Sequence, residues 1–308
     1  MRIVSGSLRC FASFIGRLPL SEALGLGEIF GSFAYYLFHR RTRIALDNLR
    51  AAFKTERYPG EFKRIAREMW RNLGRNAVEF LRLPAYTQQN IDHYVRFDDF
   101  HRVLELKNQG RGVLVLTAHL GNWDLLALSC GLKGVTVNLV TKRLRSEFLD
   151  QFWQTWRRGG TSEIVNPIQK KGAARQVIQK LREGELVAFV LDQHAKRKEG
   201  AVLVNFFGRK AATLSILAVL SRKHRIPVLP AFIVRTSRAR HRVFLEEPLY
   251  FEEMSNPEES LRHNTQRYSD IIEKYVRAYP EQWTWIHRRW KAAKRIASSQ
   301  QAVNGGHQ

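Results

Sequence analysis

A histidine followed by a carboxylate is the feature of this chain best suited to chemistry. His119 stands five positions before Asp124. It directly follows the apolar run 112–118, which is typical of a buried strand, and residues 122–132 have the pattern of a helix. His119 would therefore leave the carboxyl end of a strand, where open α/β sheets bind their ligands. Oriented by Asp124 from the first turn of that helix, its imidazole could take a proton from a hydroxyl group.

The surroundings of the pair leave two interpretations open. No serine or cysteine nucleophile motif lies nearby, so an activated hydroxyl would belong to the substrate. Alternatively, Asp124 only complements the dipole of its helix and His119 is an ordinary residue at a strand end. The catalytic interpretation therefore needs support from other parts of the chain.

Three cations follow the next predicted strand. Lys142, Arg143 and Arg145 come directly after the apolar segment 135–140. Because the carboxyl ends of parallel strands meet at one edge of a sheet, we expect these cations at the same edge as His119. They would stabilise a phosphate group or a developing oxyanion there, although most charged surface loops are simply solvated.

A second polar strand end lies further along the chain. Asp192 and Gln193 end the predicted strand 185–191 and should share the edge with His119. A later loop precedes a predicted helix over 213–224, with Thr213 as its N-cap, and could present backbone N–H groups and positive charge to an anion. The alternative is an ordinary connection between a strand and a helix. The candidate residues of this loop are Phe207, Gly208, Arg209 and Lys210.

Strand and helix patterns alternate from residue 112 onward. Strands are predicted at 112–118, 135–140, 163–165, 185–191, 227–234 and 241–245, the last as an edge strand. Helices are predicted at 122–132, 146–158, 172–182, 213–224 and 257–279, after a largely helical region over 44–100. The pattern favours an α/β fold with a mainly parallel central sheet flanked by helices.

The amino-terminal region is apolar and aromatic. Residues 23–38 contain a single charge, but these 16 positions are fewer than the ~20 that span a bilayer comfortably. Gly27 and Gly31 have a spacing that permits close helix contact, and a basic cluster follows at 39–43. We expect an uncleaved membrane-associated helix, either a marginal span or a helix in the interface. The alternative is a buried helix of a soluble protein.

These patterns suggest an organisation for the whole chain. We expect a membrane anchor or interfacial segment over residues 1–43, a main domain over 44–297 and a disordered tail over 298–308.

Lys and Arg number 51 against 28 Asp and Glu, so the net charge of +23 predicts a polyanionic partner. An anionic membrane and nucleic acid both fit, and the basic and aromatic residues at 280–291 suit either partner. The two cysteines form no disulfide or zinc pattern, which suits a reducing compartment.

Three blocks in this order resemble the late acyltransferases of lipid A biosynthesis, a lauroyl and myristoyl transferase family within the glycerolipid acyltransferase group. The first block is the His-x4-Asp motif at 119–124 with Asn122 inside it. The second combines Asp192-Gln193 with 206–208 and 212–213, and the third is the carboxyl-terminal signature over 280–291. The resemblance extends from the apolar amino terminus to about residue 291. The family's aromatic-Arg-Pro run aligns with 141–143, so Lys142 replaces its arginine and lacks the planar guanidinium fork.

The resemblance implies a reaction. His119, oriented by Asp124, would take the proton from a hydroxyl of a lipid A precursor, and the oxygen would attack an acyl thioester, with acyl carrier protein as the expected donor. Neither a cofactor nor a metal is needed. The expected partners are acyl carrier protein, a phosphorylated lipid acceptor and the membrane, at the cytoplasmic face of a bacterial inner membrane. The substrate-binding set would be Asn122, Lys142, Arg143, Arg145, Asp192, Gln193, Phe207, Gly208, Arg209 and Lys210.

Two alternatives remain open. The nearer is an acyltransferase acting on a lysophospholipid, a glycolipid or an amino-acid lipid. The remoter is a basic nucleic-acid-binding protein without enzymatic activity, although no known nucleic-acid module is recognisable and the apolar amino terminus argues against it.

Overall fold

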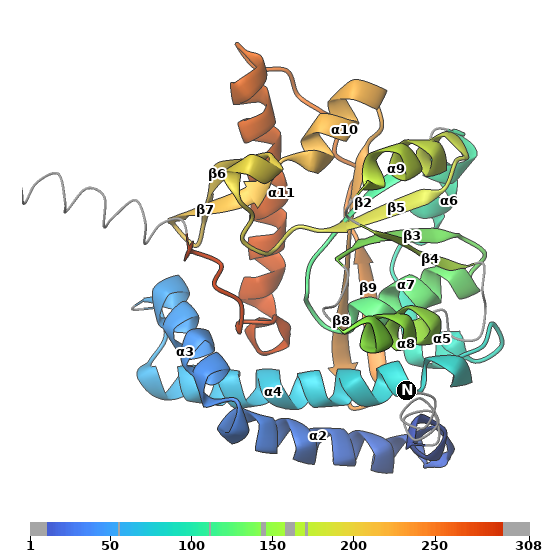
Figure 1. Ribbon diagram of the computed structural model, residues 1–308, viewed down its shortest axis with the longest axis vertical. Helices are drawn as coiled ribbons and strands as arrows, with labels where there is room; N and C mark the ends of the chain where they lie inside the picture. Colours follow the sequence, from blue (N-terminus) through green and yellow to red (C-terminus); the bar gives the residue numbers. More distant parts are fainter. Residues whose placement is uncertain are drawn as a thin grey trace, which may run out of the picture.

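A computed structural model describes residues 11–54, 56–110, 112–142, 146–157, 164–169 and 172–291. Its centre is a seven-stranded sheet in the order β1-β9-β8-β2-β5-β3-β4 (Figure 1). A separate two-stranded sheet consists of β6 (Ala201–Phe206) and β7 (Arg209–Leu214). The strands of the central sheet are β1 (Val95–Phe97), β2 (Val113–Thr117), β3 (Val137–Thr141), β4 (Val165–Gln169), β5 (Leu186–Val190), β8 (Val228–Ser237) and β9 (Arg240–Leu245).

Most strand pairs of the central sheet are parallel, which confirms the predicted fold class. The neighbours β8, β2, β5, β3 and β4 all run in one direction, and only the β8–β9 pair is antiparallel. The flanking helices are α2 (Leu20–Leu37), α3 (His39–Phe53), α4 (Pro59–Leu81), α5 (Ile91–Tyr94), α6 (His101–Asn108), α7 (Trp123–Leu132), α8 (Glu147–Arg157), α9 (Ala173–Arg182), α10 (Ile216–His224) and α11 (Pro257–Ala278).

Both faces of the sheet are covered, and a separate layer of core lies on each. Along β2, Leu114 and Leu116 join the core beneath α9, α10 and α11, whereas Val113 and Val115 join the core beneath α6 and α7. Side chains alternate between the faces of a strand, so a strand buried on both faces reads as a continuous apolar run. This is why the pattern over residues 112–118 located β2 correctly.

Two parts of the predicted secondary structure are wrong because the strands β1, β6 and β7 were not predicted. Within the predicted helical region 44–100, Val95–Phe97 form β1, which pairs outside β9, so the strand at 241–245 is not the edge. The predicted loop before residue 213 is the β6–β7 hairpin, and α10 begins only at Ile216. Thr213 therefore lies in β7 and is not an N-cap.

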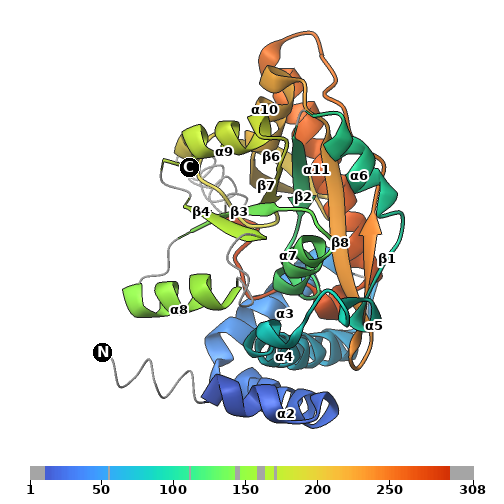
Figure 2. The same cartoon turned by 90° about the vertical axis from the view of Figure 1, so that its right-hand side faces the viewer.

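The amino-terminal helices form a layer of their own. Figures 1 and 2 both show α2 on the outer side of α4, away from the central sheet. Gly27 and Gly31 of α2 face α4, where an added Cβ at either position would collide with the backbone around Trp70 and Gly74. The close helix contact predicted from their spacing is thus present between α2 and α4.

The opposite face of α2 is apolar and open to solvent. More than half of the surface of Phe30, Phe33 and Leu37 is exposed. Across the described ranges, no helix combines the length and apolar character needed to cross a membrane. The membrane-associated helix therefore remains a prediction, as do the domain boundaries, and the tail predicted over 298–308 lies outside the described residues.

Candidate active site

Strand pairing brings His119 and Asp192 together. β2 and β5 are parallel neighbours whose last residues, Thr117 and Val190, are paired, so the residues two positions beyond each strand meet at the same edge. The Nδ1 of His119 lies 2.8 Å from Oδ1 of Asp192. The backbone N–H of His119 donates to the other carboxylate oxygen at 2.9 Å. One carboxylate thus holds both the ring and the backbone of the histidine.

The environment of Asp192 keeps it ionised. Trp283 donates its indole N–H to Oδ2 of Asp192 at 2.7 Å, adding to the two bonds from His119. Burial favours the neutral acid, but the charge and hydrogen bonds of His119 and the Trp283 bond outweigh it and lower the pKa of Asp192 to about 2. An ionised carboxylate only accepts, so Nδ1 of His119 carries the proton and its Nε2 keeps a lone pair.

The basicity of His119 follows from the same contact. Burial lowers the pKa of an imidazole, but here the charge of Asp192, its hydrogen bond and the charge of Asp124 outweigh burial and raise the pKa of His119. A raised pKa makes the imidazole a stronger base. The arrangement is suited to removing a proton from a hydroxyl that reaches Nε2.

Asp124 has a different hydrogen-bond partner. It lies in the first turn of α7, as predicted, but its carboxylate accepts a 2.6 Å bond from Nε of Arg157 at the end of α8. The hydrogen bond to the imidazole that the spacing suggested is made by Asp192 instead, because β5 delivers Asp192 directly to Nδ1. Asp124 acts on His119 through its charge.

The loop between His119 and α7 is held from two sides. Gly121 has a φ of +58°, and a Cβ there would collide with the carbonyl of Ile233 on β8. Its N–H donates to the carbonyl of Gln282, while the N–H of Thr284 donates to the carbonyl of His119. The carboxyl-terminal signature is therefore packed directly against the His-x4-Asp motif.

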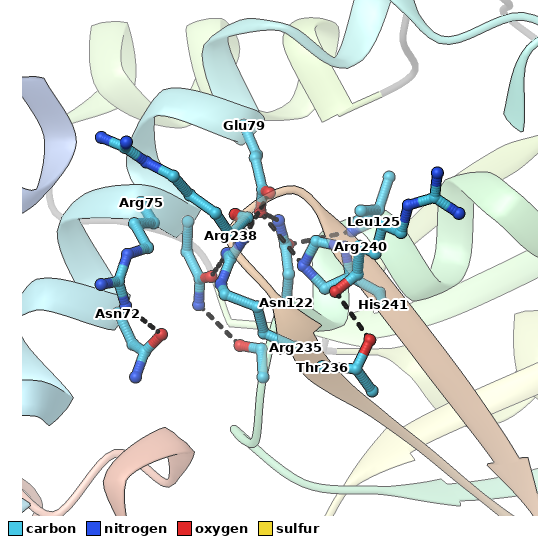
Figure 3. Close-up of polar contacts among 12 residues, drawn as sticks. Asn72, Arg75, Glu79, Asn122, Leu125, Arg235, Thr236, Arg238, Arg240 and His241 are labelled. Atoms are coloured by element: carbon cyan, nitrogen blue, oxygen red, sulfur yellow. Dashed lines mark hydrogen bonds and ion pairs between the residues drawn. The ribbon is translucent and has the colours of Figure 1, made fainter. Parts of the chain in front are cut away.

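Asn122 is part of this framework. It is the N-cap of α7, where its Oδ1 accepts the N–H of Leu125, and its Nδ2 donates to Glu79 of α4 at 2.7 Å (Figure 3). Only 2% of Asn122 is exposed. Both ends of the amide are hydrogen-bonded within the protein, so Asn122 holds the motif in place, and its contact with the substrate stays a prediction.

A buried ion pair lies behind Asn122. Two nitrogens of Arg235, on β8, donate to the carboxylate oxygens of Glu79 at 2.6 and 2.7 Å, and His241 on β9 lies next to them (Figure 3). Burial opposes the charge of Glu79, but Arg235 and His241 outweigh it and hold its pKa well below the usual range. The pair joins α4 and the sheet to the cap of α7.

The predicted cationic loop is only partly described. Lys142 follows β3 directly and is exposed, and β5 lies between β3 and β2. Lys142 therefore sits at the same edge of the sheet as His119, as expected. Arg143 and Arg145 lie outside the described residues.

The predicted anion loop at 207–210 consists of the two-residue turn of the β6–β7 hairpin, Phe207 and Gly208, and the first two residues of β7. Phe207 is 2% exposed, its N–H donates to Glu273 of α11, and its ring packs against Phe53 and Trp285. Among the described contacts, none joins Phe207, Gly208, Arg209 or Lys210 to His119. The hairpin reaches the site indirectly, because Phe206 packs against Trp283, the donor to Asp192.

Sequence reasoning missed four residues around His119. Arg157 lies on α8, while Trp283, His287 and Arg289 belong to the carboxyl-terminal signature, which was recognised without being placed at the site. Arg289 is 1% exposed and donates to the backbone carbonyl of Gln193 at 3.2 Å. Burial lowers its pKa to about 10. The clustering of Trp, His and Arg in this carboxyl-terminal segment was the signal in the sequence that could have placed the segment at the site.

The geometry of this site, at the carboxyl edge of a parallel sheet, is suited to general-base chemistry. Residues 9–292 match the bacterial lipid A biosynthesis acyltransferase family. The chain therefore belongs to this family and is an acyltransferase of lipid A biosynthesis, which confirms the resemblance.

Individual relatives cover most of the chain. A lipid A biosynthesis palmitoleoyltransferase of Escherichia coli is 27% identical over 276 residues, which is 89% of this chain and 87% of the relative. A lauroyltransferase of the same organism is 22% identical over 277 residues, 89% and 87% of the two chains. A myristoyltransferase, also from E. coli, is 24% identical over 266 residues, 86% and 79% of the two chains.

Proposed function

We propose that this protein transfers a fatty acyl chain from an acyl thioester, with acyl carrier protein as donor, to a hydroxyl of a lipid A precursor. The observation that carries the proposal is the 2.8 Å bond between Nδ1 of His119 and Asp192, which leaves Nε2 as a base. Nε2 takes the hydroxyl proton as the oxygen attacks the thioester carbonyl. When the tetrahedral intermediate collapses, the C–S bond breaks and the thiolate receives the proton from His119.

Several charged residues have a role in the proposed reaction. Asp192 orients the ring and stabilises the imidazolium, and Asp124 adds a second negative charge nearby. Lys142, and by sequence Arg143 and Arg145, would bind the phosphate groups of the acceptor or the developing oxyanion. The net charge of +23 favours association with a phosphorylated lipid and an acidic carrier protein. The reaction needs neither a cofactor nor a metal.

We further propose that the exposed face of α2 docks on the cytoplasmic face of a bacterial inner membrane. Phe30, Phe33 and Leu37 would enter the interface while the glycine face of α2 stays on α4. The basic residues at 39–43 at the start of α3 would then meet anionic headgroups. Such docking would bring the site to a lipid acceptor without requiring a membrane span.

A transfer assay in detergent tests substrate and donor together. Purified protein would receive lauroyl, myristoyl or palmitoleoyl chains on carrier protein or coenzyme A, because the relatives named above differ in acyl chain. The acceptor would be a tetra-acylated, phosphorylated lipid A precursor, with lysophospholipid and glycolipid as alternatives. The proposal predicts a mass gain of one acyl chain on the lipid A precursor with carrier protein as donor. Acylation of only another acceptor would refute it.

A further inference from the structure

The side-chain amide of Gln193 lies between two imidazoles. Its Nε2 is 3.0 Å from Nε2 of His287 and 3.2 and 3.3 Å from Nδ1 and Nε2 of His119. An atom this close to both nitrogens of one ring lies over the ring face, because an approach in the plane would collide with the carbon between them. The amide of Gln193 therefore does not block a hydroxyl that approaches along the in-plane lone pair on Nε2 of His119.

We propose that His287 is a positioning residue for acyl transfer. Its Nε2 accepts the hydrogen bond from Gln193, which holds the amide against the ring of His119 and keeps Nε2 directed at the acceptor hydroxyl. Asp192 fixes one edge of the imidazole, and the Gln193–His287 pair fixes its face. This inference rests on the proposed role of His119 as the base.

Acting as the acceptor requires His287 to be neutral. Burial and the charge of His119 lower the pKa of His287, with Arg41 of α3 acting in the same direction and Asp192 opposing them. The ring centroids of His287 and His119 are 5.9 Å apart. A protonated His287 would lose the bond from Gln193 and place a second positive charge beside the imidazolium that forms during transfer.

The backbone of His287 is anchored independently of its side chain. Its carbonyl accepts bonds from Nδ2 of Asn48, on α3, at 2.6 Å and from the N–H of Arg289 at 2.9 Å. Replacing the imidazole therefore leaves the segment in place, which makes the side chain's contribution measurable.

The experiment compares His287→Ala and His287→Gln with the wild type in the transfer assay. We expect His287→Ala to lower kcat about 10- to 100-fold, with KM for the lipid within about twofold, because it misplaces the base. His287→Gln supplies a carbonyl that can accept from Gln193 and should recover most of the loss. His263→Ala is the control, since that exposed histidine also bonds through Nε2, to Glu252, and should leave kcat unchanged.

The pH dependence separates positioning from a structural role. The pKa of His119 is raised and that of His287 is lowered, so in the wild type the acidic limb of kcat/KM should begin with a one-proton slope as His119 protonates and steepen at lower pH, where His287 protonates as well. With His287→Gln it should keep a one-proton slope. If His287→Ala fails to fold, the His287→Gln profile decides the question.

Full activity in His287→Ala, an effect confined to KM, or an unchanged acidic limb in His287→Gln would overturn the positioning role while leaving His119 as the base. His119→Ala is measured in parallel. Continued transfer by that variant would instead refute the proposed function, and the role of His287 with it.

Discussion

His119 is a stronger base than a free histidine because the ionised Asp192 lies against its ring. Replacing Asp192 with Asn keeps the shape of the side chain but removes the charge that raises the pKa of His119. The acidic limb of kcat/KM should therefore move to lower pH, while the plateau falls by about 10²- to 10⁴-fold because the imidazolium loses its partner. An unchanged plateau would show that Asp192 does not orient the base.

The pH dependence of kcat/KM for Asp124→Asn compares the effects of the two carboxylates on the pKa of His119. Asp124 raises the pKa of His119 by charge alone, and its hydrogen bond goes to Arg157. We expect the acidic limb to move in the same direction as in Asp192→Asn, but by less. A larger shift in Asp124→Asn would contradict the assignment of Asp192 as the orienting carboxylate.

Sequence spacing could identify His119 but not its hydrogen-bond partner. Asp124 is close in the chain, whereas Asp192 is 73 positions away and reaches the ring only because β2 and β5 are paired. The placement of Asp192 at the same sheet edge was predictable from its position after a buried strand. Which carboxylate meets Nδ1 depends on strand pairing, which local patterns do not encode.

Among the elements, the Glu79–Arg235 pair fixes α4 to the sheet behind the motif. Glu79→Gln would leave the guanidinium of Arg235 buried without its counter-charge, because both residues are under 10% exposed. We expect a loss of about 3–5 kcal/mol in the free energy of unfolding, measured by urea denaturation at neutral pH. Asp47→Asn, which breaks an exposed pair with Arg50, should cost at most about 1 kcal/mol.

The pH dependence of stability should show the same ion pair. The pKa of Glu79 is lowered from 4.5 in the folded state, so its contribution is present above pH 4.5 and is lost as the pH falls below it. Glu79→Gln should therefore flatten the acid limb of the stability curve. Parallel curves for the variant and the wild type would contradict a stabilising ion pair.

Among the secondary-structure elements, the β6–β7 hairpin is one that the sequence patterns did not predict. Phe207 and Gly208 both have positive φ, 54° and 65°, as a two-residue type I′ turn requires. Phe-Gly is an unusual sequence for such a turn, where Asn-Gly or Asp-Gly is the common signal, so the segment resembled a loop before a helix. Packing of Phe207 against Phe53 and Trp285 accompanies this conformation.

For the whole molecule, the exposed apolar face of α2 should determine membrane binding. Phe30 and Phe33 are 59% and 69% exposed, so the double variant Phe30→Asp/Phe33→Asp should fold normally. We expect at least tenfold weaker binding to phosphatidylglycerol-containing vesicles, because burying one such ring contributes about 1.5–3 kcal/mol. Met254→Asp, at a 40% exposed residue away from α2, is the control. Equal vesicle binding by the wild type, the double variant and Met254→Asp would exclude α2 as the docking face.

The role of His119 as the base is tested most directly by the transfer rate of His119→Ala beside that of the wild type, with acyl carrier protein as donor and a phosphorylated lipid A precursor as acceptor. The side chain of His119 is 24% exposed, so its removal should leave the fold intact. We expect an acylated product for the wild type and a rate at least about 10²-fold lower for the variant. Transfer at the wild-type rate by a folded His119→Ala protein would contradict the role of His119 as the base.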